Sequence, residues 1–185
     1  MTTTTTRTRR APATAGPRWL LGRWARLALL TAHLLAVGAW IGIDVVVAVL
    51  VVAGWFGVDP ALRGAAYQAL ATYVVGPMLT AALASLVTGL LLGLGTKWGL
   101  LRYWWVAVKL ALNVVLCTLI VVALQPGMAA VGDYGRALAA GQDPTGEVTT
   151  LFYPPAVSLT ALSLAVVLAV FKPWGRVRRT RRAGS

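Results

Sequence analysis

Four polar side chains lie inside long apolar stretches, and these are the residues that could do chemistry. They are His33, Asp44, Lys109 and Asn113. An ionisable group is costly inside a bilayer, so it usually faces the interior of a helix bundle and often marks a ligand, ion or proton pathway. His33 is the only histidine, so it could give one axial ligand to a haem or one ligand to copper, with a second copy supplying another. We take the four as candidate functional positions and His33 as the candidate cofactor-binding residue.

Each candidate also has an interpretation as a structural residue. His33 is either a ligand or a neutral, hydrogen-bonded packing residue. Asp44 lies deeper in the same stretch and is either functional or a protonated carboxyl bonded to the Tyr73 carbonyl or to Ser158. Lys109 either extends its ammonium group to the membrane surface or stays buried, at a depth where it could meet His33.

The apolar residues are concentrated in four stretches of a chain that is 58% hydrophobic over 185 residues. The stretches cover about 27–52, 69–94, 104–124 and 154–171. At about 1.5 Å per residue, each is long enough, or just long enough, to cross a hydrocarbon core of ~30 Å as an α-helix. We therefore predict an all-α fold, a four-helix antiparallel transmembrane bundle. The membrane domain would cover 19–174, between a disordered tail at 1–18 and a basic tail at 175–185.

Proline and glycine predict where these helices begin, bend and end. Pro60 suits the first turn of the second helix, and Pro77 predicts a kink within it because proline lacks the N–H that the helix needs. The Gln-Pro-Gly sequence at 125–127 predicts the end of the third span. We expect a polar loop over 128–150, with a short helix near 134–140.

Small residues predict where two helices approach closely. Gly38 and Gly42 are four residues apart on the first span, and Ser85, Gly89 and Gly93 repeat every four residues on the second. Such spacing lets backbones pack together in membranes. We predict that the Gly38 and Gly42 face packs against the second stripe.

The charge distribution predicts an orientation. The net charge is +12, but the basic residues gather near both chain ends and in the connection between the second and third spans, and all acidic residues except Asp44 lie in the other connections. Basic residues beside apolar spans act as topology signals, which argues against nucleic acid as a partner. We expect both termini in the cytoplasm of a bacterium and a multi-pass protein of its inner (plasma) membrane.

One part of the sequence resembles a known family. The pattern His33-x6-Trp40-x-Gly42 is similar to the opening helix of CopD-like membrane proteins, the copper-resistance family. The other similar positions are Thr88, Gly89, Gly99 and Lys109. As a whole, the chain resembles the uncharacterised four-span integral membrane proteins of high-GC bacteria. The resemblance implies a four-helix membrane domain.

The sequence carries no nucleotide-binding loop, nucleophile elbow or zinc-protease motif, so we expect no enzyme. We interpret the chain as a structural or partner-binding membrane subunit in contact with the lipid bilayer, with a second copy or another membrane protein as its partner. The alternative is a protein that handles a small solute, copper or haem through His33, Asp44 and Lys109.

Overall fold

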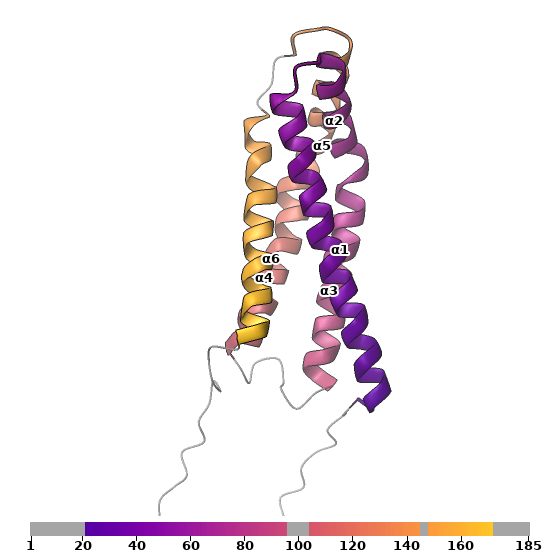
Figure 1. Ribbon diagram of the computed structural model, residues 1–185, viewed down its shortest axis with the longest axis vertical. Helices are drawn as coiled ribbons and strands as arrows, with labels where there is room; N and C mark the ends of the chain where they lie inside the picture. Colours follow the sequence, from indigo (N-terminus) through magenta and orange to yellow (C-terminus); the bar gives the residue numbers. More distant parts are fainter. Residues whose placement is uncertain (1–20, 96–103, 145–147, 172–185) are drawn as a thin grey trace, which may run out of the picture.

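The computed structural model describes residues 21–95, 104–144 and 148–171, and within these the regular structure is entirely helical. Four helices are long and apolar enough to cross a membrane. The first two are α1 (Arg23–Phe56) and α3 (Val75–Gly95). The third is a helical stretch that starts with α4 (Trp104–Leu119), and the fourth is a stretch that ends with α6 (Tyr153–Phe171). They alternate in direction, each packs on the next, and α6 closes the bundle against α1 (Figure 1). The predicted four-helix antiparallel bundle is confirmed.

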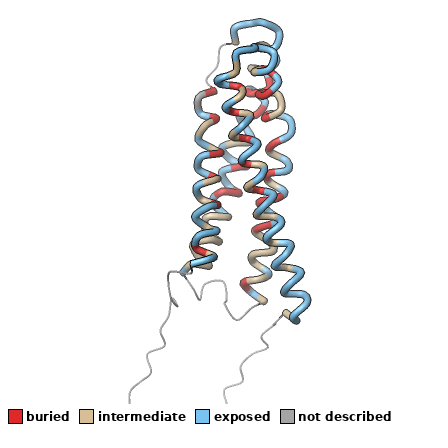
Figure 2. The backbone as a smooth tube through the Cα atoms, viewed as in Figure 1, coloured by how far each residue is buried: buried red, intermediate tan, exposed pale blue. Residues whose placement is uncertain are grey.

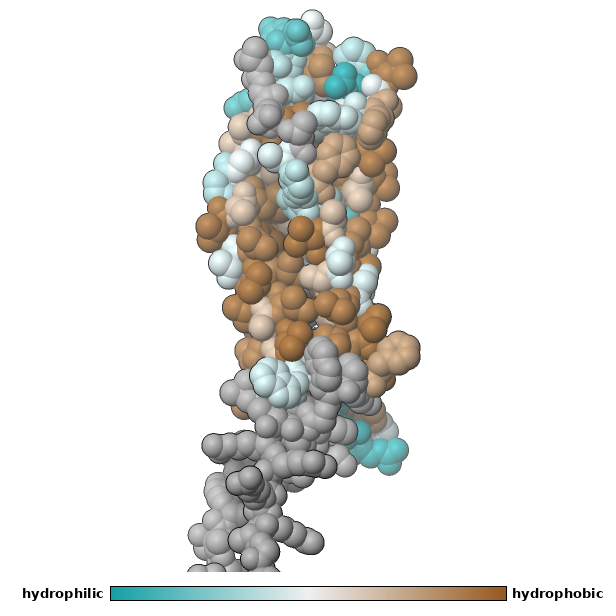
Figure 3. All heavy atoms as spheres, turned by 90° about the vertical axis from the view of Figure 1, so that its left-hand side faces the viewer, coloured by the Kyte–Doolittle hydropathy of each residue, from teal (hydrophilic) through white to brown (hydrophobic). Residues whose placement is uncertain are grey.

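The outside of this bundle is apolar, as a lipid-facing surface must be. Large side chains such as Leu35 and Val49 are 69% and 61% exposed. Figure 3 shows hydrophobic atoms over most of the visible face of the spanning helices and hydrophilic atoms gathered at the upper end. This is the architecture of a multi-pass membrane protein. The two predicted tails lie outside the described residues.

The second predicted helix divides into α2 (Pro60–Tyr73) and α3. Asp59 caps α2, because its carboxylate accepts a 2.9 Å hydrogen bond from the Ala61 N–H. The break falls at Val74, one turn before Pro77, where the proline cannot donate to the Tyr73 carbonyl. The predicted interruption is confirmed.

The helix does not end at 125–127, where the third span was predicted to end and the polar loop to begin. The helix continues from α4 through a π-helical turn, η1 (Ile120–Leu124), and a 3₁₀ turn, η2 (Gln125–Gly127), into α5 (Met128–Ala139). The wide π turn and the tight 3₁₀ turn accommodate the proline at position 126, which has no N–H to donate. The expected polar loop therefore begins only after α5, and the short helix expected near 134–140 is the end of α5.

Helix α5 forms because it has a partner. It packs along α2 beyond the spanning part of the bundle, at the top of Figure 1. The two backbones touch at glycines: a Cβ on Gly64 would lie 2.5 Å from the Gly135 carbonyl oxygen, and a Cβ on Gly135 would lie 2.7 Å from the Gly64 oxygen. Val131 and Leu138 of α5 are buried. We call this end of the molecule the α2–α5 end.

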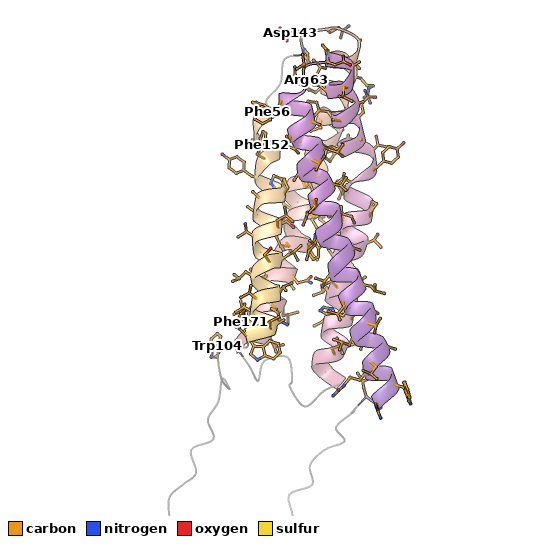
Figure 4. All side chains as sticks on the ribbon, in the orientation of Figure 1. Phe56, Arg63, Trp104, Asp143, Phe152 and Phe171 are labelled. Carbon is orange, nitrogen blue, oxygen red and sulfur yellow. The ribbon has the colours of Figure 1, made fainter. Side chains whose placement is uncertain are left out.

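Aromatic contacts join the end of α1 to the start of α6. The Phe152 ring lies 5.6 Å from the Trp55 ring and 6.4 Å from the Phe56 ring, in edge-on geometry. Figure 4 shows Phe56 and Phe152 near the α2–α5 end, with Trp104 and Phe171 at the opposite end. The last turn of α1 and the turn before α6 are thus held together near the α2–α5 end.

Buried residues are unevenly distributed along the bundle. In α1 they begin only at Trp40 and continue to Gly54, and Figure 2 shows the first turns of α1 almost wholly exposed. Trp40, Ala82 and Tyr67 are at most 1% exposed. The core therefore lies in the half of the bundle nearer the α2–α5 end.

The predicted packing of Gly38 and Gly42 against α3 is not found. A Cβ on either glycine would meet nothing within 4 Å in the described chain. Helical geometry gives the reason: at about 100° per residue these glycines lie on the far side of α1 from His33 and Asp44, and the polar face is the one turned inward. On α3, by contrast, Ser85 and Gly93 are buried.

The contact between α2 and α5 predicts that Gly135→Ala is destabilising. Its methyl group would collide with backbone of Gly64 and force the helices apart, at about 1–3 kcal/mol. The free energy of unfolding in detergent measures this. The matched control is Gly38→Ala, which meets open space and should be neutral or slightly stabilising. Equal stability of the two variants would contradict the close contact.

Candidate functional site

The most deeply buried charged residue is held by one hydrogen bond. The Ser158 hydroxyl of α6 donates to the Asp44 carboxyl of α1 at 2.5 Å. Asp44 is 1% exposed and Ser158 is 8% exposed. Ser158 was one of the two predicted partners; the other, the Tyr73 carbonyl, makes no hydrogen bond with Asp44 among the described residues. The bond joins the first and last helices across the bundle.

Asp44 and Ser158 line a cavity of about 920 Å³. Its walls come from α1, α3, the continuous segment from α4 to α5, and α6 with the 3₁₀ turn before it, η3 (Thr149–Phe152). Most of the wall is aliphatic. Leu119 and Val157 also line it and are 43% and 49% exposed, so its lining reaches the outer surface of the bundle at α4 and at α6.

The π turn forms part of this wall. Ile120, Ala123 and Leu124 all line the cavity and all lie in η1. A π turn widens the helix locally and is often found at functional sites. Here it diverts the backbone beside the cavity, just before the segment that meets α2.

Trp40 adds an unsatisfied donor to the cavity wall. Its side chain is 0% exposed and lines the cavity. Its indole Nε1 has no hydrogen-bond partner among the described residues. Buried donors in folded proteins are almost always paired, so this N–H is a polar group of the cavity wall that a ligand could use.

A second buried polar atom without a partner lies at the α2–α5 end. The Tyr67 hydroxyl is enclosed under α5, where its ring packs edge-on at 5.3 Å from that of Tyr134. Burial raises the pKa of Tyr67, and the nearby Arg63 opposes that rise. The phenol is therefore neutral throughout the physiological range. Tyr67 does not line the cavity that holds Asp44.

His33 lies in a different layer of the bundle. Its Nδ1 is 2.9 Å from the Thr88 hydroxyl oxygen of α3. The Thr88 hydroxyl donates its single hydrogen to the Ala84 carbonyl at 2.6 Å, so toward His33 it can only accept. His33 therefore donates from Nδ1, and a neutral ring keeps its lone pair on Nε2. Gly89 leaves room for this ring, because a Cβ there would lie 3.2 Å from Cε1.

Asn113 extends this layer to α4. Its amide donates to the Ser85 hydroxyl at 3.0 Å and its carbonyl oxygen accepts from the Cys117 thiol at 3.4 Å. Ser85 was predicted as a packing residue; it is 2% exposed and is also a hydrogen-bond acceptor. The amide thus connects α3 and α4 as His33 connects α1 and α3.

Lys109 lies near the same layer. Its ammonium group sits 4.6 Å from the centre of the Trp105 ring, one turn nearer the end of the bundle, as expected for a side chain that reaches toward the membrane surface. Lys109 also lies in the neighbourhood of His33, in agreement with their predicted similar depth.

The four predicted residues therefore do not form one site. His33 and Asp44 are eleven residues apart on α1, or about 16 Å along the helix. His33, Lys109 and Asn113 belong to the lower polar layer, whereas Asp44 belongs to the cavity. Within the described residues, no group of three or more His, Cys, Asp or Glu side chains is placed to hold a metal ion.

The cavity itself was missed by sequence reasoning. In the sequence, Trp40 was named only within the pattern that resembles the opening helix of CopD-like proteins, and the wall contributed by η1 and α5 was expected to be helix end and loop. The sequence did contain a pattern that could have predicted the continued helix, because apolar and small residues continue beyond the proline at 126.

Comparison with known proteins does not place the chain in a family: no family model, curated protein or solved structure matches it. Among the positions of the CopD-like resemblance, the structure brings His33 into contact with Thr88 and Gly89. The argument for function therefore depends on the geometry of the bundle.

The hydrogen bond between Ser158 and Asp44 predicts that substitutions at its two ends change stability by different amounts. Ser158→Ala removes the one hydrogen bond that Asp44 makes among the described residues, and should lower stability by about 1–3 kcal/mol. Asp44→Asn should stay close to the parent protein, since its amide oxygen still accepts from Ser158. Thermal unfolding in detergent measures both.

Ser163→Ala is the matched control, because Ser163 lies on the same helix and is exposed. If Ser158→Ala were as stable as Ser163→Ala, the bond would not support the bundle. An Asp44→Asn protein that fails to fold would show instead that a carboxyl is required there.

Proposed function

We propose that this multi-pass membrane protein binds a small, largely apolar molecule in the cavity between its helices. The observation that carries the proposal is the 920 Å³ cavity that holds a buried carboxyl and an unpartnered indole N–H. Ligand sites are typically concave and mostly apolar, with a few polar groups that orient the ligand. A cavity of about 300–1,000 Å³ is the usual size for such a molecule.

The position of the cavity supports entry from the membrane. Leu119 and Val157 are both exposed and both line it, so its lining reaches the outer surface of the bundle, which faces the lipid tails. A molecule dissolved in the bilayer could enter without first crossing the polar headgroups. Asp44, at the inner wall, would then orient the ligand's polar group.

A structural or partner-binding subunit is the second candidate function. Gly38 and Gly42 favour it, because they leave the outer face of α1 open to close approach by another helix. The partner would be a second copy or a different membrane protein. Such a subunit needs no ligand, so a measurement of ligand binding distinguishes the two candidate functions.

We further propose that both termini lie in the cytoplasm and that the α2–α5 end faces outward across a bacterial inner membrane. The support is the positive-inside rule. Arg23 and Arg26 lie at the end of the bundle opposite α2 and α5, whereas Asp59, Asp133 and Asp143 all lie in or beside the α2–α5 end (Figure 4).

The ligand-binding proposal predicts that filling the cavity blocks binding. Ala130 lines the cavity and its neighbour Ala129 does not, although both are exposed. Ala130→Trp should weaken saturable binding of the neutral dye N-phenyl-1-naphthylamine by about tenfold or more, since an indole would occupy the site. Dye fluorescence with the purified protein, above the detergent background, measures this.

Ala129→Trp is the control and should bind the dye like the parent. Two variants that bind equally well would place the dye elsewhere. No saturable binding in the parent protein would remove the ligand proposal and favour the partner-binding subunit.

The orientation predicts which face a water-soluble reagent can reach. Cys117 is the only cysteine and it is buried, so a Cys117→Ala background allows one new cysteine at a time. Gln142→Cys, in the exposed turn after α5, should react with a membrane-impermeant maleimide added to intact spheroplasts. Reaction only in inside-out vesicles would reverse the orientation.

A further inference from the structure

We infer that the ligand of the cavity is a lipophilic cation, an apolar molecule that carries a positively charged nitrogen or phosphorus centre. This inference rests on the ligand-binding function proposed above and specifies the charge of the ligand. Three features of the cavity support it: the acidic side chains of its lining, its aromatic rings, and the Asp44 oxygen that makes no hydrogen bond within the described residues.

The charged groups that line the cavity are acidic. Asp44 lies at its inner wall and Asp133 lies on α5. Among the described residues of the lining there is no lysine or arginine. Asp133 forms an ion pair with Arg136, which is exposed and does not line the cavity. The one carboxyl without a cationic partner among the described residues of the cavity is therefore Asp44.

One carboxyl oxygen of Asp44 is available for a further hydrogen bond. Ser158 donates to its Oδ2, and the structure gives Oδ1 no hydrogen bond within the described residues. A carboxylate removed from water is strongly unfavourable unless it is paired. A cation in the cavity would supply the missing charge at close range, in an apolar setting where the attraction is much stronger than in water.

Aromatic rings complete the site for a cation. Trp40, Tyr134 and Tyr153 all line the cavity. The faces of aromatic rings attract cations, tryptophan most strongly, and quaternary ammonium groups are recognised in this way. The aliphatic wall of α4 and η1 suits the apolar part of the same molecule. An anionic ligand would meet none of these favourable interactions.

The test compares two ions of nearly the same shape and opposite charge, tetraphenylphosphonium and tetraphenylborate. Equilibrium dialysis against the purified full-length protein in a nonionic detergent, with a protein-free detergent blank, measures both affinities. We expect the parent protein to bind the cation at least about tenfold more tightly than the anion. Asp44→Asn should abolish that preference while unfolding thermally at close to the temperature of the parent protein, which shows that the bundle remains folded.

Asp143→Asn is the matched control. It removes the same charge from an exposed turn that does not line the cavity, and its cation preference should equal that of the parent protein. A general effect of net charge would instead lower the preference in both variants, and that result would overturn the role of Asp44.

The remaining outcomes separate this inference from the proposed function. Equal binding of both ions, preference for the anion, or binding of the neutral dye alone would overturn the cation inference and leave a ligand cavity. An unchanged cation preference in Asp44→Asn would also overturn it. Failure of the dye and both ions to bind the parent protein would remove the ligand-binding function itself.

Discussion

The burial of one carboxyl group between the first and last helices is the constraint on which this bundle depends. Asp44 is almost completely removed from solvent and lies in a membrane-spanning helix, where an unsatisfied polar group is expensive. Ser158 satisfies one of its oxygens, and the two residues are separated by 114 positions in the chain. Their bond fixes which face of α1 and which face of α6 turn inward.

That choice of face has consequences along the whole of α1. Because His33 lies on the same side of the helix as Asp44, it too is turned toward the bundle and meets α3 at Thr88. Gly38 and Gly42 are turned outward for the same reason. The polar residues are thereby sorted into two layers, one around the His33 and Asn113 hydrogen bonds and one at the cavity that Asp44 lines.

The α2–α5 end keeps that cavity in shape. Glycine contacts bring α2 and α5 together at backbone distance, and α5 reaches this position because a π turn and a 3₁₀ turn carry the helix past Pro126. The same π turn lines the cavity. A segment that would otherwise be a helix end and a loop therefore serves as a wall, and an apolar site with one buried acid and an unpartnered indole N–H follows from it.

The sequence by itself determined the number of spanning helices, the place of Pro60 in the first turn of the second helix, a break near Pro77 and the two candidate partners of Asp44. These features depend on local quantities: the length of an apolar stretch, a missing N–H, a helical period. Only the tertiary structure decided that Ser158 is the partner, that the helix continues past Pro126, that Gly38 and Gly42 face outward, and that a cavity lies beside Asp44. Those outcomes depend on which surfaces of helices distant in sequence pack together, and a local pattern carries no information about that pairing.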